Sequence, residues 1–148
     1  MFSTLDVHRT QPRSGDTPTA CANACRGFLD AALPRLPHVC IASLSTTDGR
    51  ALAFAIGRGA VDPQRIGAMA SSSLALAESF ARETLRSTCN YSLVATAHGV
   101  IVTVRVPSTR RLHVLTIAAD DSEMLAIALR NAIDLADGLA AILDQAQT

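Results

Sequence analysis

The sequence of 148 residues contains no lysine and no tryptophan, and aromatic residues make up only 3% of it. Its formal net charge is zero, because 13 arginines balance 13 aspartates and glutamates. A chain without a basic excess lacks the field that gathers nucleic acid or an anionic membrane. Few aromatic rings also leave little surface on which bases could stack. We therefore predict that neither nucleic acid nor a membrane is its partner.

Cysteine pairs and long apolar runs are missing as well. The four cysteines, Cys21, Cys25, Cys40 and Cys89, include no CxxC pair, so we expect small, buried, reduced thiols. The N-terminal stretch has no apolar signal core, and no run reaches the roughly 20 apolar residues that a membrane helix needs. These features predict a cytoplasmic protein.

What the sequence does contain is the composition of one globular domain. Apolar residues make up 49% of the chain and charged residues 18%, and a chain of this length suits a single core. Residues 1–16 mix polar residues, proline and glycine without periodicity, which predicts a flexible tail. The folded domain is predicted over residues 17–148.

Hydrophobic periodicity predicts a helix, two strands, a helix, three strands and a helix. The helices are expected over 17–33, 62–85 and 122–146, and the strands over 38–44, 50–56, 91–96, 100–106 and 112–117. Asp48-Gly49 is a hairpin signal, and Asp62-Pro63 predicts a capped start for the middle helix. Residues 120–122 (DDS) are expected to cap the last helix. Both groups of strands connect through hairpins, so the sheet is predicted to be antiparallel with helices on its faces.

No group of residues in the sequence carries a recognisable chemistry. The four histidines, His8, His38, His98 and His113, are scattered without metal-ligand spacing. The serines at 71–73 lie inside a predicted helix, with no nearby base and no GxSxG motif. No glycine-rich phosphate-binding motif is present. We predict a protein that is not an enzyme and has no catalytic residues, cofactor or metal; a hydrolase using a serine with His98 or His113 is an alternative.

The predicted middle helix has an unusual distribution of side chains. Small residues form one continuous face, made of Gly67, Ala68, Ser71, Ser72, Ala75 and Ser79. Large apolar residues on the opposite side are expected to enter the core: Ile66, Met69, Leu74, Ala77, Phe80 and Ala81. After Arg65 the next charge is Glu78, which is spaced to pair with Arg82. Small side chains let another helix approach closely, so we interpret this face as a subunit interface; a helix buried in its own monomer, or an Ala/Ser-rich face in solvent, is the alternative.

The strand predicted at 91–96 is expected at a sheet edge. An unpaired edge can add a strand from a second chain, which assigns Tyr91 and Leu93 to the same interface. A symmetric dimer could join two such edges and pair two middle helices at once, because an isologous contact closes on itself.

Two of these segments together resemble the Roadblock/dynein light-chain family, in its bacterial branch. The hairpin at 42–53 (ASLSTTDGRALA) and the helix at 66–78 (IGAMASSSLALAE) carry the resemblance. It extends over residues 18–146, with a last helix of similar type. Residues 1–16 lie outside the family pattern, and residues 118–122 (AADDS) lack the asparagine or glycine often found before the last helix.

The resemblance implies an α/β sandwich with a profilin- or longin-like architecture. Its five-stranded antiparallel sheet would carry the middle helix on one face and the other two helices on the opposite face. It also implies a dimeric, non-catalytic scaffold or regulator of small Ras-like GTPases or related signalling proteins, which dock on the paired middle helices. The candidate dimer and partner residues are Arg65, Ala68, Met69, Ser71, Ser72, Ala75, Ser79, Arg82, Tyr91 and Leu93. A profilin- or PAS-like sensor of a small molecule is the alternative, and it would need a pocket with converging polar groups.

Overall fold

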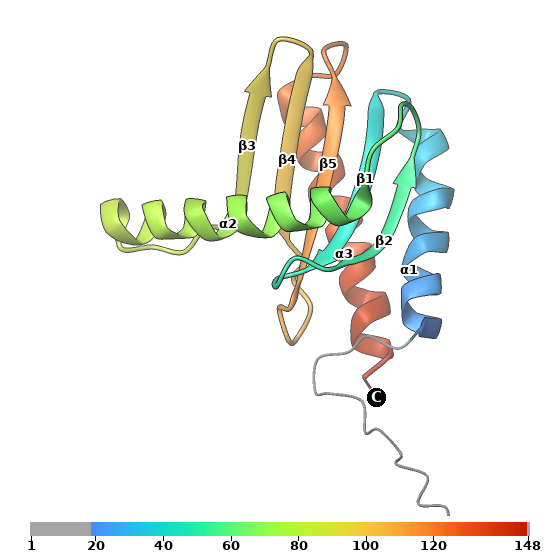
Figure 1. Ribbon diagram of the computed structural model, residues 1–148, viewed down its shortest axis with the longest axis horizontal. Helices are drawn as coiled ribbons and strands as arrows, with labels where there is room; N and C mark the ends of the chain where they lie inside the picture. Colours follow the sequence, from blue (N-terminus) through green and yellow to red (C-terminus); the bar gives the residue numbers. More distant parts are fainter. Residues whose placement is uncertain (1–18, 148) are drawn as a thin grey trace, which may run out of the picture.

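The computed structural model describes residues 19–147, so the tail predicted at 1–16 lies outside the described residues. The elements follow the predicted helix-strand-strand-helix-strand-strand-strand-helix order (Figure 1). The helices are α1 (Thr19–Ala32), a 3-10 turn η1 (Leu33–Arg35), α2 (Pro63–Leu85) and α3 (Leu125–Gln145). The strands are β1 (Val39–Thr46), β2 (Ala51–Ile56), β3 (Tyr91–Thr96), β4 (Gly99–Arg105) and β5 (His113–Asp120). The α/β sandwich predicted for the chain is confirmed.

The five strands form one antiparallel sheet in the order β2-β1-β5-β4-β3. Both predicted hairpins are present, and β1 and β5 pair in the centre. The first hairpin turns at Asp48-Gly49 as predicted: the Thr46 hydroxyl donates to the Asp48 carboxylate, and Gly49 takes a φ of 93°, which favours glycine. The edges of the sheet are β2 and β3.

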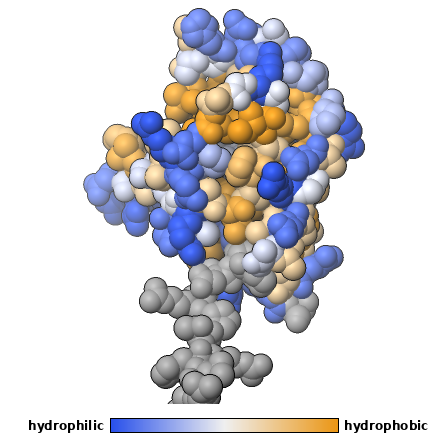
Figure 2. Space-filling view, turned by 45° about the vertical axis from the view of Figure 1, so that its right-hand side comes forward, coloured by the Kyte–Doolittle hydropathy of each residue, from blue (hydrophilic) through white to orange (hydrophobic). Residues whose placement is uncertain are grey.

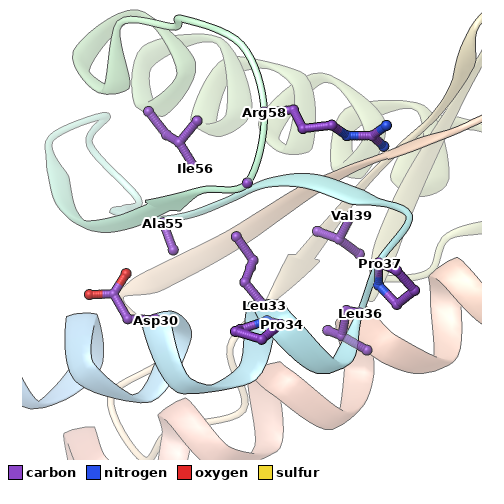
Figure 3. A pocket seen from close by; sticks show the side chains of 10 residues that line it. Asp30, Leu33, Pro34, Leu36, Pro37, Val39, Ala55, Ile56 and Arg58 are labelled. Atoms are coloured by element: carbon purple, nitrogen blue, oxygen red, sulfur yellow. The ribbon is translucent and has the colours of Figure 1, made fainter.

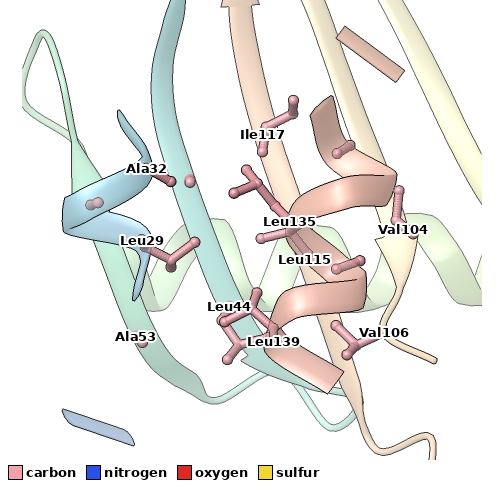
Figure 4. Packing of buried hydrophobic residues seen from close by; sticks show 14 of the residues in the cluster. Leu29, Ala32, Leu44, Ala53, Val104, Val106, Leu115, Ile117, Leu135 and Leu139 are labelled. Atoms are coloured by element: carbon pink, nitrogen blue, oxygen red, sulfur yellow. The ribbon is translucent and has the colours of Figure 1, made fainter. Parts of the chain in front are cut away.

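One face of the sheet packs against α1 and α3 and contains most of the buried core (Figures 1 and 4). Alternate residues of the central strands point to this side, so that Leu44 and Leu115 meet Leu29 from α1 and Leu139 from α3. The four side chains are fully buried. The arrangement of α1 and α3 on one face, with α2 on the other, follows the implied pattern.

The last helix begins later than predicted. Asp120 remains in β5, where its N–H donates to His38 O at 2.8 Å and its carboxylate binds the Arg58 guanidinium. The residue before α3 is Met124, which has no side-chain capping bond. The prediction that residues 120–122 cap α3 was therefore wrong, because partners distant in sequence hold Asp120 in the sheet.

The cysteines are free, with Cys21 and Cys25 buried and Cys40 and Cys89 half-buried. Among residues 19–147, no helix combines the length and the apolarity needed to traverse a lipid bilayer.

Candidate functional site: the α2–β3 surface

The helix α2 begins and ends on clear local signals. Asp62 caps it as predicted, since its carboxylate accepts the N–H of Gln64 at 3.0 Å and Pro63 occupies the first turn. The helix runs for 23 residues and stops at Arg86, which is left-handed with a φ of 51°. Its length lets it cross the sheet from the β1–β2 hairpin to β3 and beyond (Figure 1).

Three contacts fix the line along which α2 crosses the sheet. A Cβ on Gly67 would lie 3.2 Å from the Ser45 Cβ, Leu74 packs on Val114, and Glu78 binds Arg105. The strand register places Ser45, Val114 and Arg105 side by side on β1, β5 and β4. Because Tyr91 pairs with the neighbouring Val104, α2 crosses near the beginning of β3, and most of β3 extends to one side of the helix (Figure 1).

Part of the small-residue face packs within the same chain. A Cβ on Gly49, in the β1–β2 turn, would lie 3.1 Å from the Ser71 Oγ and 3.3 Å from the Ala68 Cα. Ser71 is partly buried, and its hydroxyl donates to Ala68 O. Close approach of the hairpin turn therefore accounts for the small size of these two residues. Ala68 nevertheless remains exposed, as do Ser72, Ala75 and Ser79.

The structure corrects the expected core side of α2. The buried positions are Gly67, Ala70 and Leu74. Met69 and Phe80, predicted to enter the core, are 57% and 63% exposed. They lie on the side of α2 opposite Ala68, at helical spacing that turns them toward the length of β3. Leu76, also exposed, extends this apolar stripe.

The strand β3 is an edge strand, as predicted, and its side chains are mostly exposed. Tyr91 and Leu93 pair with Val104 and Val102, whose side chains belong to the core under α3. Tyr91 and Leu93 therefore point to the α3 side of the sheet, and Val94 points to the α2 side. An edge strand with one free side and apolar residues on both faces is suited to pairing with a further strand.

The opposite edge, β2, is flanked by α1. The Arg26 guanidinium of α1 lies 5.6 Å from the centre of the Phe54 ring of β2, a cation–π distance. The helix α1 therefore packs against β2, whereas α2 crosses only the beginning of β3.

A strip of the sheet beside α2 is apolar and only partly covered. The register aligns Ile56, Ile41, Ala118, Ile101 and Val94 in one row across the five strands. The two ends of the row, Ile56 and Val94, are exposed. Figure 2, an oblique view of the α2 side, shows apolar surface between hydrophilic margins.

The charged groups around α2 divide into two kinds. Arg65 and Arg82 are exposed. Glu78 accepts a hydrogen bond from Arg105 at 2.7 Å, so this long-range ion pair takes the place of the local Glu78–Arg82 pair that the spacing favoured.

The remaining candidate residues are placed as described above, so the structure puts all ten on α2 or β3.

A polar cluster lies at the opposite end of the sheet. The Arg58 guanidinium binds the Asp120 carboxylate and lowers the pKa of that carboxyl below its ordinary value. The other Asp120 oxygen lies 3.3 Å from His38 Nδ1. Within residues 19–147, no three metal-ligating side chains come together.

A pocket of about 430 Å³ lies between the end of α1 and the end of β2 (Figure 3). Most of its lining residues are of apolar type, two of them prolines, and Asp30 and Arg58 are the charged residues. Figure 3 shows them on opposite sides, and the Arg58 guanidinium is held by Asp120. The converging polar groups that a small-molecule sensor needs are not found in this pocket.

The fold is that of the Roadblock/LC7 class. It resembles a Roadblock/LC7 domain from Streptomyces avermitilis with a TM-score of 0.69 and 17% identity, covering 80% of this chain and 96% of that one. Two MglB structures are also similar. MglB of Myxococcus xanthus has a TM-score of 0.72 and 14% identity over 84% of this chain and 91% of its own. An MglB described with a tetrameric arrangement has a TM-score of 0.77 and 14% identity over 92% and 99%. No protein-family model matches the sequence, and no curated protein matches it significantly.

Proposed function

We propose that this protein is a non-enzymatic, dimeric regulator or scaffold that binds a small Ras-like GTPase or a related signalling protein. The observation that carries the proposal is the continuity of an exposed apolar stripe on α2 with the open edge of β3. The similarity of the fold to MglB and Roadblock/LC7 domains supports the same class.

The proposed dimer joins two β3 edges about a twofold axis. Because α2 crosses β3 near Tyr91, its Met69–Phe80 side faces the rest of β3 and the twofold axis. The twofold axis places the Met69–Phe80 side of the second copy's α2 next to that of the first. The last turns of α2 extend past β3 (Figure 1) and carry Phe80 and Leu85, whose side chains are 63% and 78% exposed. In the dimer they would cover the apolar row at Val94 and Ile101 on the other copy.

The outward residues of the two helices form the proposed partner surface. Arg65 and Arg82 are its polar anchors, and Ala68, Ser72, Ala75 and Ser79 form its small-residue floor. A surface built by two copies binds only while the dimer holds, so contact with the partner depends on the dimer contact as well as on these residues.

Light scattering over a range of concentrations tests the dimer. We expect a dimer mass for the parent chain and a monomer mass for Phe80→Glu, because a carboxylate would be buried at the contact. Met124→Glu is the matched control, since Met124 is an equally exposed apolar residue, 69% accessible, before α3. Ala75→Glu should leave the dimer mass unchanged, because Ala75 lies on the outward small-residue face of α2 and not on its Phe80 side. A monomeric parent, or a dimer that Phe80→Glu leaves intact, contradicts the proposal.

Affinity capture from the native cell, with GTP or GDP analogues added, tests the partner. We expect a small GTPase whose retention depends on the nucleotide. Arg65→Glu with Arg82→Glu should abolish retention while the dimer mass stays unchanged. Equal retention by the parent and this double variant contradicts the assigned surface.

A further inference from the structure

Fewer buried apolar residues lie between α2 and the sheet than on the other face of the sheet, although α2 contacts all five strands. The buried apolar residues between α2 and the sheet are Ala70 and Leu74 of α2 and Val114 of β5, with Cys89 packed beside them. The opposite face holds the large cluster contributed by α1, α3 and four strands. A helix held by few buried apolar groups has low local stability, even in a domain that is stable overall.

The part of the sheet that faces α2 is also polar. Ser43 and Ser45 of β1 point to this side, because Ala42 and Leu44, which alternate with them along the strand, enter the opposite core. Thr116 of β5 is aligned with Ser43, and its hydroxyl lies 3.5 Å from that of Thr103. All four side chains are buried. This row runs across β1, β5 and β4 on the α2 side of the sheet.

Two of these hydroxyls destabilise the arrangement in which α2 lies on the sheet. The Oγ atoms of Ser43 and Ser45 are buried and find no hydrogen-bond partner among the described residues. A buried hydroxyl without a partner loses the hydrogen bonds that it makes in water. Water would restore them if α2 moved away, so these serines favour an open position of the helix.

An ion pair opposes that opening. Glu78 of α2 accepts from the Arg105 guanidinium at 2.7 Å, and the pair is largely shielded from solvent. The backbone N–H of Arg105 also donates to Asn90 O at 3.3 Å, just before β3. Arg105 therefore holds α2 through its side chain and the chain entering β3 through its backbone.

We propose that α2 is a separable helix, which lifts from the sheet while the α1–α3 core stays folded, and that Glu78 and Arg105 form the latch that closes it. The helix opens over the polar row and takes its exposed apolar stripe with it. A signal that weakens the latch would therefore alter any contact made by that stripe. The latch belongs to a single chain and does not require the proposed dimer.

Hydrogen exchange followed by mass spectrometry on the full chain tests this proposal. In the parent we expect the α2 amides at 67–82 to exchange roughly a hundredfold faster than the α3 amides at 130–143, as in sub-global opening. Glu78→Gln should speed exchange in α2 about tenfold and leave α3 unchanged. Arg130→Gln is the control, because Arg130 forms an exposed pair with Asp134 within α3.

A variant with the opposite effect keeps the test decisive. Ser43→Ala removes an unpartnered hydroxyl from beneath the helix, so it should slow exchange in α2 about fivefold without changing α3. Equal protection of α2 and α3 in the parent overturns the proposal, and so does a parallel change of both helices in the variants. Light scattering on the same samples reports the mass separately, so failure of the proposed dimer and failure of the latch give different results.

Discussion

The Glu78 carboxylate of α2 and the Arg105 guanidinium at the end of β4 form a hydrogen-bonded ion pair, with 2.7 Å between Oε2 and Nη2. The two residues are 27 positions apart in the sequence, and their side chains are 29% and 18% exposed. No other charged contact between described residues links α2 to the sheet. The pair therefore offers a direct measure of how firmly this helix is attached.

A double-mutant cycle should give a coupling of about 2 kcal/mol between Glu78 and Arg105, typical of hydrogen bonds between charged groups out of water. The variants are Glu78→Gln, Arg105→Gln and the double variant, measured by urea unfolding. The same cycle on the exposed Arg130–Asp134 pair should give about 0.4 kcal/mol. Equal coupling in the two cycles would show that the Glu78–Arg105 pair is no stronger than a surface pair.

Replacing two helical glycines by alanine should change the unfolding free energy in opposite directions. A Cβ on Gly67 would lie 3.1 Å from Gly49 O and 3.2 Å from the Ser45 Cβ, so Gly67→Ala should cost about 1 to 3 kcal/mol of unfolding free energy through overpacking. Gly27 in α1 has nothing within 4 Å of such a Cβ. Gly27→Ala should therefore stabilise the protein by about 0.5 to 1 kcal/mol, because alanine has the higher helix propensity. Thermal unfolding of both variants checks the difference in sign.

Stability should fall as the pH drops below neutrality, because burial lowers the pKa of His113 below its ordinary value. In the unfolded chain, His113 takes up a proton near pH 6.5. In the folded chain His113 stays neutral down to a lower pH, so between these two pH values acid favours the unfolded state. His113→Gln should flatten the dependence of unfolding free energy on pH between 7 and 5. His98 is exposed in the β3–β4 turn, and His98→Gln serves as the control. An unchanged slope in His113→Gln would assign the acid sensitivity to other groups.

The cysteines should differ in their reaction with iodoacetamide. Burial, followed by the neighbouring Cys21, raises the pKa of the Cys25 thiol to about 12, which suppresses the reactive thiolate. Cys40 and Cys89 are half-buried and should be alkylated first in the native protein. Peptide mass spectrometry at rising urea should show Cys25 labelled only across the unfolding transition. Labelling of Cys25 in the absence of urea would mean that α1 opens in the native state.

Local signals in the sequence were enough to define most of the elements. Pro63 after Asp62 sets the start of α2 because the cap and the fixed φ of proline act within one turn. The strand β3 covers the predicted residues 91–96, since the chain turns on both sides of it. The order of the elements and the Asp-Gly turn then leave few arrangements for an antiparallel sheet.

The orientation of α2 was decided by the tertiary structure. Periodicity placed Met69 and Phe80 in the core, because large apolar residues on a helix usually face inward. The surface that receives α2 is instead built from β1, β4 and β5, where Ser43, Thr103 and Thr116 lie side by side although they are far apart in the sequence. Leu74 packs beside this row on Val114, whereas Met69 and Phe80 remain exposed.

The sequence by itself determined which segments are helices and strands, because caps, turns and hydrophobic period act over a few residues. The tertiary structure decided what each surface faces. Asp120 stays in β5 because Arg58 reaches it from the loop after β2 and His38 from the turn before β1, and Glu78 binds Arg105 instead of Arg82. In each case the deciding partner lies in a segment that is distant in the sequence and that the fold brings close.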